Sequence, residues 1–243
     1  MYSRRASPGF GNQTTPTRRA VTKGKTRVSP LEKPRAKPLK RPSQARAKFT
    51  VQAIYDAFVR IWRAHGWAGL TTRAIALETG ISVGTLYEYF PNKNALLSGY
   101  VRHGLDRLLT RIESDVVAAT GLSWQERVRR WVRLVCGVEP VVHFDAEMLL
   151  LEGQFSELKH HRRVYEELAT QLIRVLAACK DLPRPIDAEK DAVMVKSLYT
   201  AVFGARRYFL LIQARDLDYA AWVGEMERLC LAALGDAPAK EAL

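Results

Sequence analysis

The side chains best suited to contact a ligand lie in residues 70–97, where the sequence is L-T-T-R-A-I-A-L-E-T-G-I-S-V-G-T-L-Y-E-Y-F-P-N-K-N-A-L-L. Their chemistry is hydrogen bonding, with positive charge from Arg73 and Lys93. Local spacing suggests no Ser/His/Asp set anywhere in the chain, and neither a phosphate-binding glycine loop nor a nucleophile elbow occurs. Enzyme activity therefore has no positive support. We expect no catalytic residue, no metal ligand and no cofactor.

Two short helices and a sharp turn must present these side chains. Thr71 can cap the first helix, because its hydroxyl can accept a hydrogen bond from a free amide of the opening turn. Gly80 suits the left-handed position that ends a helix. Ser82 is a second N-cap candidate and predicts a helix over residues 83–89, roughly 10 Å long. That length fits a B-DNA major groove, which is about 12 Å wide.

The predicted helix 83–89 has one inward side. Leu86 and Phe90 are four residues apart and face inward, and Ile81 is expected in the core. The positions left for solvent or DNA are Val83, Gly84, Thr85, Tyr87, Glu88 and Tyr89. Gly84 would let the backbone approach DNA closely, and Val83 could contact a thymine methyl group. The residues that we expect nearest to base edges are Val83, Gly84, Thr85 and Tyr87.

Asn92 should cap a third helix and place Lys93 in its first turn, beside the same surface. Two helices, a turn and a third helix together indicate a helix-turn-helix. The pattern T-T-R-A-I-A-x-x-T-G-I-S-V-G-T-L-Y-E-Y-F-x-N-K-x-x-L resembles the DNA-binding domain of the TetR family of bacterial transcriptional regulators. The resemblance extends back over Thr50 to Gly66 and covers about fifty residues, roughly a fifth of the chain.

The resemblance also implies roles for single residues. Tyr89, Lys93 and either Thr71 or Thr72 should contact phosphate. The complete expected DNA-binding surface is Thr71, Thr72, Ser82, Val83, Gly84, Thr85, Tyr87, Tyr89 and Lys93. One position departs from the family: Ala74 stands where an acidic residue is frequent, so the reciprocal half of a capping box is missing.

The remaining sequence predicts helices throughout. Apolar residues recur every three or four positions from Thr50 to His65, Gly66 ends that helix, and Trp67 should pack against the helix-turn-helix. Later helices are expected near 93–119, 123–137, 140–151, 154–180, 187–214 and 216–234, with breaks at Gly121, near Pro140, at Gly153, over Pro183 to Pro185 and around Asp216. The fold class is therefore all-α. An N-terminal three-helix helix-turn-helix DNA-binding domain is followed by a C-terminal helical ligand-binding and dimerisation domain.

The expected divisions are a basic N-terminal tail (1–47), the DNA-binding domain (48–98), the regulatory and dimerisation domain (99–236) and a C-terminal tail (237–243). The resemblance to TetR regulators implies that the last two helices form a four-helix bundle with a second subunit. A homodimer would then bind a pseudo-palindromic operator. Periodicity agrees, because these helices carry wide apolar stripes made of Val195, Leu198, Tyr199, Val202, Phe203 and Phe209, and of Trp222, Met226, Leu229, Cys230 and Ala233.

The three cysteines are Cys136, Cys179 and Cys230, an odd number at wide spacing that fits neither a disulfide framework nor a metal knuckle. Their apolar surroundings predict buried thiols and a reducing compartment.

No apolar run approaches the 18 or so residues of a membrane span, and no secretory signal is visible. We expect a cytoplasmic protein without a membrane partner.

Charge divides the chain into two parts. Residues 1–48, here called the basic segment, hold 14 lysines and arginines against one acid, Glu32. Residues 49–243 hold 24 basic and 24 acidic residues, so the whole net charge of +13 lies in the basic segment. With six prolines and few large apolar residues, this segment is predicted to be disordered up to the first helix.

The use of the basic segment is left open by its sequence. The stretch K-P-R-A-K-P-L-K-R-P, from Lys33 to Pro42, favours a non-specific DNA arm. The alternatives are a solvated leader without function and a start codon assigned too far upstream. An organelle transit peptide is also acid-poor and rich in arginine, but the prolines would spoil its amphipathic helix.

The regulatory region offers material for a mostly apolar effector cavity with a few polar groups: Trp131, His143, Phe144, Met148, Phe155, Tyr165, Tyr199 and Arg206. The alternative is that each of these is ordinary core. His143 and Glu147 are four apart on a predicted helix, but two ligands are too few for a metal and a hydrogen bond is favoured. Either Arg206 or Arg207 could pair with an acid at the dimer interface or meet an anionic ligand.

The most economical function is a sequence-specific DNA-binding transcriptional regulator. The resemblance implies a repressor that leaves its operator when a small apolar or aromatic effector binds. One alternative is an architectural DNA-binding protein that acts mainly through the basic segment with little sequence preference. An enzyme carrying such a domain would need a catalytic cluster in residues 120–240, and none is visible.

Overall fold

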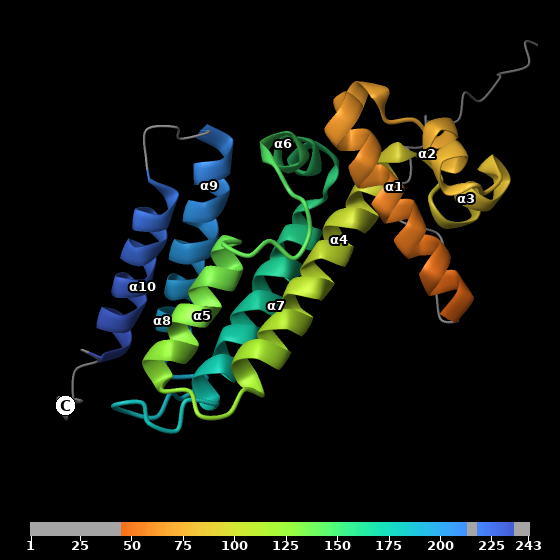
Figure 1. Ribbon diagram of the computed structural model, residues 1–243. Coiled ribbons are helices and arrows are strands. Elements are labelled where there is room, and N and C mark those ends of the chain that lie inside the picture. Colours follow the sequence, from red (N-terminus) through yellow and green to blue (C-terminus); the bar gives the residue numbers. More distant parts are fainter. Residues whose placement is uncertain (1–44, 213–217, 236–243) are drawn as a thin grey trace, which may run out of the picture. The chain divides into compact units, whose positions relative to one another are not determined.

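The computed structural model describes residues 45–212 and 218–235 (Figure 1). Within these ranges the chain is helical and contains no strand, which confirms the all-α class. Most of the N-terminal tail 1–47, and all of the C-terminal tail 237–243, lie outside the described residues. The helices of the N-terminal half are α1 (Ala45–Gly69), α2 (Thr72–Thr79), α3 (Val83–Tyr89) and α4 (Lys93–Ile112). Those of the second half are α5 (Trp124–Cys136), α6 (Ala146–Phe155), α7 (Leu158–Ala177), α8 (Ala192–Tyr199), α9 (Ala205–Ile212) and α10 (Tyr219–Gly235).

Helix α1 forms because its apolar residues recur on one face. Ile54, Phe58 and Ile61 on that face are buried. The helix begins at Ala45, earlier than predicted, and it does not simply end at Gly66. Gly66 has φ 60° and ψ −166°, a backbone conformation that kinks the chain before one more helical turn.

Helix α4 contributes to two hydrophobic clusters. Leu96, Leu97 and Tyr100 pack in the N-terminal cluster, which is built on α1, α2 and α3. Leu108 and Ile112, farther along α4, pack in the C-terminal cluster with α5, α7 and α8. Helix α4 therefore belongs to both hydrophobic clusters.

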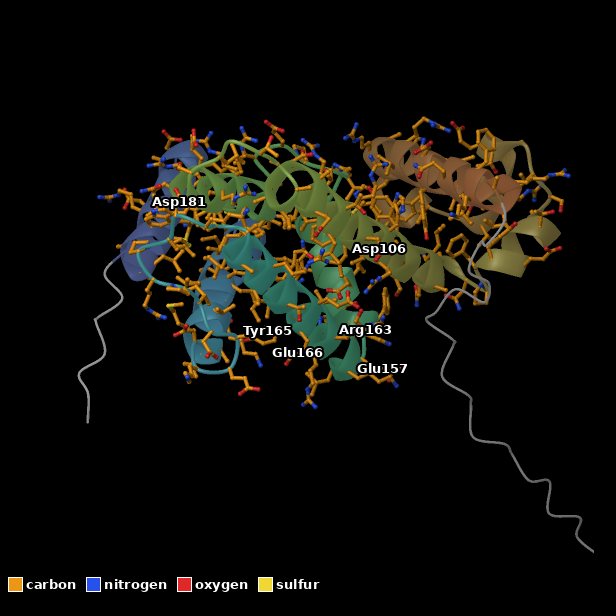
Figure 2. All side chains as sticks on the ribbon, turned by 90° about the horizontal axis from the view of Figure 1, so that it is seen from below. Asp106, Glu157, Arg163, Tyr165, Glu166 and Asp181 are labelled. Atoms are coloured by element: carbon orange, nitrogen blue, oxygen red, sulfur yellow. The ribbon has the colours of Figure 1, made fainter. Side chains whose placement is uncertain are left out.

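Helix α4 is also tied to α7 by a chain of ion pairs. Arg102 of α4 bonds Asp106 one turn away at 2.6 Å and Glu167 of α7 at 2.6 Å. Arg163 of α7 then bonds Glu167 at 2.8 Å. Figure 2 labels the two outer members of this chain, Asp106 and Arg163. These half-exposed pairs hold the two helices in register, although each contributes little to stability.

The region around α6 differs from the prediction at both ends. The helix begins at Ala146 and not near 140, because Asp145 is its N-cap and accepts a hydrogen bond from the Met148 amide at 2.9 Å. Gly153 does not break it, and the helix continues to Phe155. His143 therefore precedes the helix. The prediction that His143 and Glu147 lie one turn apart on the same helix is wrong.

Helix α5 lies at the centre of the second half. Figure 1 shows α5 beside α7 and α10, and the three share the C-terminal cluster. Two π-helical segments also pack on α5: η1 (Glu113–Val117) extends α4, and η2 (Thr200–Gly204) joins α8 to α9. Helix α10 is further fixed by Glu227, which bonds Arg133 of α5 at 2.7 Å. None of the described helices is long and apolar enough to span a bilayer.

The apolar stripes expected to meet a second subunit are largely used within the chain. Val195, Leu198, Tyr199, Val202 and Cys230 are all buried in the C-terminal cluster. Most exposed apolar side chains on the last helices lie outside these stripes: Val193, Tyr208, Leu211 and Ile212. The two apolar stripes as a whole are therefore not available to a second subunit, and that part of the prediction is wrong. Of the eleven stripe residues, only Leu229 and Ala233 are exposed.

Candidate nucleic-acid interface

Three N-caps fix the helices of the candidate interface. The Thr71 hydroxyl accepts a hydrogen bond from the Ala74 amide at 3.0 Å, and the Ser82 hydroxyl accepts one from the Thr85 amide at 2.9 Å. The Asn92 side chain accepts a third from the Ala95 amide at 2.8 Å. All three predicted caps are confirmed, and each satisfies an amide that the helix leaves free.

The turn between α2 and α3 depends on Gly80. Its φ of 69° is in the left-handed region, and its amide donates to the last carbonyls of α2. Ile81 follows and is partly buried against the N-terminal cluster. Arg60 of α1 bonds Glu78 at 2.8 Å and holds the outer side of α2. The turn therefore sets the angle between α2 and α3 through one glycine and one apolar contact.

Helix α3 keeps one side open. Val83 is 37% exposed and Tyr87 is 45% exposed, so both side chains are accessible to a partner. Ser82 and Gly84 are also exposed, and Thr85 is half-buried. The Tyr87 hydroxyl lies 3.3 Å from the Thr72 hydroxyl of α2, so the two helices share a polar contact on this side. Leu86 faces the other way and is fully buried.

Tyr89 does not lie on the open side. Its side chain is only 7% exposed, and its ring centroid is 6.5 Å from that of Phe90. The expectation that Tyr89 remains for solvent or DNA is wrong, because position 89 follows the buried Leu86 by three residues and shares its face. Any contact from Tyr89 to a phosphate would have to use the small part that stays accessible.

Lys93 is held by the end of α1. Its ammonium lies 4.2 Å from the centroid of the Trp67 ring and donates to the Trp67 carbonyl oxygen at 3.4 Å. The Trp67 ring also lies 6.1 Å from that of Trp62 and 6.0 Å from that of Phe155 in α6. Trp67 therefore packs against the helix-turn-helix as predicted, and it also contacts a helix of the second half.

A polar network that the sequence analysis missed joins α1 to α6. The Trp62 indole donates to the Asp145 carboxylate at 2.7 Å, and Asp145 is the N-cap of α6. His143 Nε2 lies 3.2 Å from the same carboxylate, and the Tyr100 hydroxyl donates to the His143 carbonyl at 2.7 Å. No sequence signal points to this network, because the bonds from Trp62 to Asp145 and from Tyr100 to His143 span 83 and 43 positions.

The eight residues expected to line one effector cavity are not brought together. Trp131, Tyr165 and Tyr199 pack in the C-terminal cluster. Phe144, Met148 and Phe155 instead pack in or against the N-terminal cluster, where they support α1 and α4. The prediction of a single set is therefore wrong. The cause is α6, whose apolar side packs against the N-terminal cluster.

Two buried donors on α5 have no hydrogen-bond partner among the described residues. The Trp131 side chain is 1% exposed, and its indole nitrogen makes no hydrogen bond. One helical turn earlier, the Arg127 guanidinium donates to the carbonyls of Val116, Val117 and Ala119 at the end of η1, but its Nε is unpaired. A buried donor without a hydrogen bond lowers the stability of the folded state, so native proteins contain few of them. Two such donors distinguish this part of the C-terminal cluster from ordinary core.

The remaining polar candidates have partners within the chain. Arg207 bonds Glu152 of α6 at 3.3 Å, so this arginine pairs with an acid of its own subunit. Arg206 packs against Gly137 beside the Tyr219 hydroxyl, and burial lowers the pKa of its guanidinium. His143 pairs with Asp145, and the described part of the chain holds no group of three or more metal-ligating side chains.

A capped helix, a left-handed glycine turn and a second capped helix with an open side define a helix-turn-helix DNA-binding module. Residues 54–99 match the family model of the bacterial regulatory proteins of the tetR family. By this match the chain carries a DNA-binding domain of the TetR family of transcriptional regulators.

Curated relatives match parts of the chain. The nucleoid occlusion factor SlmA of Marinomonas sp. (strain MWYL1) is 27% identical over 133 residues, 51% of this chain and 64% of that protein. The tetracycline repressor protein class D of Escherichia coli is 34% identical over 83 residues, 34% of this chain and 36% of that protein. The chain thus spans less than two thirds of the length of either relative.

Solved structures share the fold. A TetR transcription regulator from Haloarcula marismortui aligns with a TM-score of 0.56 at 22% identity, covering 78% of this chain and 98% of the other. The fatty acid degradation regulator FadR from Bacillus halodurans aligns with a TM-score of 0.54 at 18% identity, covering 83% and 100%. At these identities the likeness concerns the arrangement of helices.

Proposed function

We propose that the protein is a sequence-specific repressor that binds a pseudo-palindromic operator as a homodimer and leaves it when a small apolar or aromatic effector binds. The observation that carries the DNA-binding part is the open side of α3, held between the caps of Ser82 and Asn92. The repressor part is supported by the tetracycline repressor among the relatives.

Residues of the open side take distinct roles in this proposal. Val83, Gly84, Thr85 and Tyr87 lie nearest to base edges in the major groove, and Ser82 fixes the helix start beside them. Thr71, Thr72 and Lys93 contact phosphates and set the register of the helix. The hydrogen-bonding distance between the Tyr87 and Thr72 hydroxyls supports a shared surface for both groups. Tyr89 serves mainly as core.

The homodimer would use the face that α8, α9 and α10 leave open. Tyr208, Leu211 and Ile212 of α9 are exposed on adjacent turns, and Val193 of α8 is 79% exposed. Small residues lie between these positions on the same face, at Ser197, Thr200, Ala201 and Gly204. An apolar face of this length with small residues allows close helix packing against a second copy.

The effector would bind in the C-terminal cluster near Trp131. Support comes from its unpartnered indole N–H and from the two π-helical segments on either side of α5, since π-helical turns occur frequently at functional sites. Tyr165 and Tyr199 meet edge to face in the same cluster, with centroids 5.3 Å apart. These groups suit a ligand that is mostly apolar and carries one hydrogen-bond acceptor.

Helix α6 would carry the signal to DNA. Its N-cap Asp145 bonds Trp62, its last residue Phe155 contacts Trp67, and its buried Glu152 bonds Arg207 of α9. Suppose that a ligand binds the form of the protein released from DNA a hundredfold more tightly than the DNA-bound form. The coupling free energy between ligand binding and DNA binding is then about 2.7 kcal/mol. Movement of α6 would then shift α1 and the start of α4.

The test begins with selection of duplexes from a random library by the full-length protein. Binding to the selected and to random duplexes is then compared at physiological salt. A specific regulator should prefer the selected sequence by more than about a thousandfold, and the selected site should be pseudo-palindromic. A ratio near one would reject the proposal and favour an architectural DNA-binding protein.

A further inference from the structure

Glu88 is the only charged side chain of α3. It is exposed, and no hydrogen bond or ion pair joins its carboxylate to another described residue. The other acid of the helix-turn-helix differs in this respect, because Glu78 bonds Arg60 of α1 at 2.8 Å. Among the described residues, no cation balances the charge that Glu88 brings to the open side of the module.

The local structure does not require a carboxylate at position 88. The helical neighbours with which it could pair, three and four positions earlier, are Thr85 and Gly84, and neither carries a charge. Glu88 also lies in the last turn of α3, where the helix dipole disfavours negative charge. The charge therefore does not contribute to the stability of α3.

The geometry of α3 directs Glu88 to its open side. At 3.6 residues per turn, Glu88 lies about 160° around the helix from the buried Leu86 and about 40° from the exposed Gly84. A helical side chain leans toward the N-terminus of its helix and covers the preceding turn. At Gly84 that turn is bare: apart from its chain neighbours, an added Cβ would meet only the Ser82 hydroxyl oxygen, at 3.6 Å. The Glu88 carboxylate thus has room to extend over Gly84.

We propose that Glu88 is a specificity-determining residue, whose carboxylate accepts a hydrogen bond from the N4 amino group of a cytosine in the major groove. This inference rests on the proposed function, in which α3 lies in that groove. A carboxylate can only accept, and the only major-groove donors are the amino groups of cytosine and adenine.

Cytosine is the better partner of the two bases. The adenine amino group lies between two acceptors, N7 of the same base and O4 of the paired thymine, and both repel a carboxylate. The cytosine amino group has one such neighbour, O6 of the paired guanine. The open flank of cytosine therefore favours the approach of Glu88.

The same charge acts against other DNA sequences. A carboxylate that finds no amino group faces phosphates and base acceptors, which repel it. Glu88 thus gives specificity partly by weakening the complexes that lack the cytosine. Its removal should raise the affinity for random DNA and lower the preference for the operator.

The test repeats the selection from a random duplex library with the full-length E88Q and E88A variants. The wild-type protein should require a cytosine at one position of each half-site, and any other base there should weaken binding about 5- to 150-fold. E88Q should prefer adenine at this position, because a glutamine amide can pair with both N6 and N7. E88A should accept all four bases there, and the other positions should stay unchanged.

E189Q is a matched control, since it removes the same charge from an exposed acid outside the helix-turn-helix. It should keep every base preference and the wild-type affinity for random duplexes, whereas E88Q and E88A should bind random duplexes more tightly. All variants should keep the wild-type melting temperature. An unchanged base preference in E88Q and E88A would overturn the proposal, and so would a wild-type preference for a base other than cytosine at the position that they alter.

The wild-type selection separates this inference from the proposed function. A wild-type protein that prefers no sequence over random duplexes would reject the proposed function, and the role of Glu88 would fall with it. A wild-type protein that selects a pseudo-palindromic operator, from which the selections of E88Q and E88A do not differ, would reject the role of Glu88 alone.

Discussion

The ammonium group of Lys93 lies 4.2 Å above the Trp67 ring and donates to the carbonyl oxygen of the same residue at 3.4 Å. A lysine in the first turn of α4 is thus positioned by the end of α1. Because the Trp67 ring also contacts Phe155 of α6, the lysine is two contacts away from the second half of the chain. A movement of α6 could therefore change the position of Lys93 and with it the proposed phosphate contact.

The first prediction concerns this pair. Lys93→Ala should weaken binding to all DNA sequences about equally and lower the salt slope by roughly one. Trp67→Leu should produce part of the same loss, because the ammonium loses its cation–π partner. In the double variant the losses should not add, since both act through one contact. Anisotropy titrations of the three variants measure the cycle. Additive losses, or an altered base preference at one position, would contradict it.

Local signals in residues 70–97 were sufficient to predict this part of the fold. An N-cap involves residues two or three apart, so Thr71, Ser82 and Asn92 could be identified from the sequence alone. Tyr89 was predicted wrongly although its spacing of three from Leu86 carried the correct signal.

The effector region could not be predicted from the same kind of signal. Met148 has the apolar character expected of a cavity or a core, but only the packing of α6 shows that it joins the N-terminal cluster. The unpaired nitrogen of Trp131 likewise depends on which neighbours surround it in three dimensions. Tertiary contacts decided these positions, and periodicity reports only which side of a helix is apolar.

The second prediction concerns Gly137, the C-cap of α5. Its φ is 75°, and an added Cβ would lie 2.9 Å from a guanidinium nitrogen of Arg206. Gly137→Ala should therefore lower the free energy of unfolding by about 1 to 3 kcal/mol, through backbone strain and displacement of a buried cation. Gly153→Ala in α6, where a Cβ meets nothing within 4 Å, should be neutral or slightly stabilising. Urea unfolding of both variants tests the contrast.

The third prediction concerns alkaline pH. Burial raises the pKa of the Cys136 and Cys230 thiols from 9.0 to about 12 and that of Cys179 to about 11. Between pH 9 and 11 the unfolded chain loses these protons and the folded chain keeps them, so the free energy of unfolding falls as pH rises. Each thiol contributes a slope of about 1.4 kcal/mol per pH unit.

Urea unfolding at pH 8, 9 and 10 measures this dependence. Cys230→Ala should remove one thiol contribution from the slope while leaving the other two. The wild-type thiols should also react with Ellman's reagent slowly, because the reactive thiolate is scarce in the folded state. Stability that stayed constant up to pH 10, or rapid labelling of all three thiols at pH 8, would contradict the burial of these groups.

The fourth prediction concerns the open face of α9 and α10. Tyr208→Glu and Leu229→Glu should each shift the protein from dimer toward monomer in sedimentation at micromolar concentration, because a charge would be desolvated at the interface. Leu158→Glu provides a matched control, since Leu158 is also exposed but lies at the start of α7. A monomeric wild-type protein would reject the dimer, and equal effects of all three variants would reject the assignment of the face.

The last prediction concerns the unpaired indole of Trp131. Acetophenone and α-methylstyrene have nearly the same shape, but only the ketone has a hydrogen-bond acceptor. If the Trp131 indole N–H donates a hydrogen bond to the bound effector, the wild-type protein should bind the ketone about five times more tightly, as one net hydrogen bond of about 1 kcal/mol implies. Trp131→Phe removes the N–H and keeps an aromatic ring, so this preference should disappear. Trp124→Phe, another tryptophan of α5, should keep it.

Thermal shifts of the free protein measure the two affinities, and anisotropy with the selected operator measures release. Because coupling between two sites is reciprocal, the ketone should weaken operator binding by the factor by which operator weakens ketone binding. A ketone that stabilises the free protein without releasing DNA would show a binding site but reject the switch. Equal binding of both compounds to the wild-type protein, or their failure to bind, would reject Trp131 as the donor to ligands of this size.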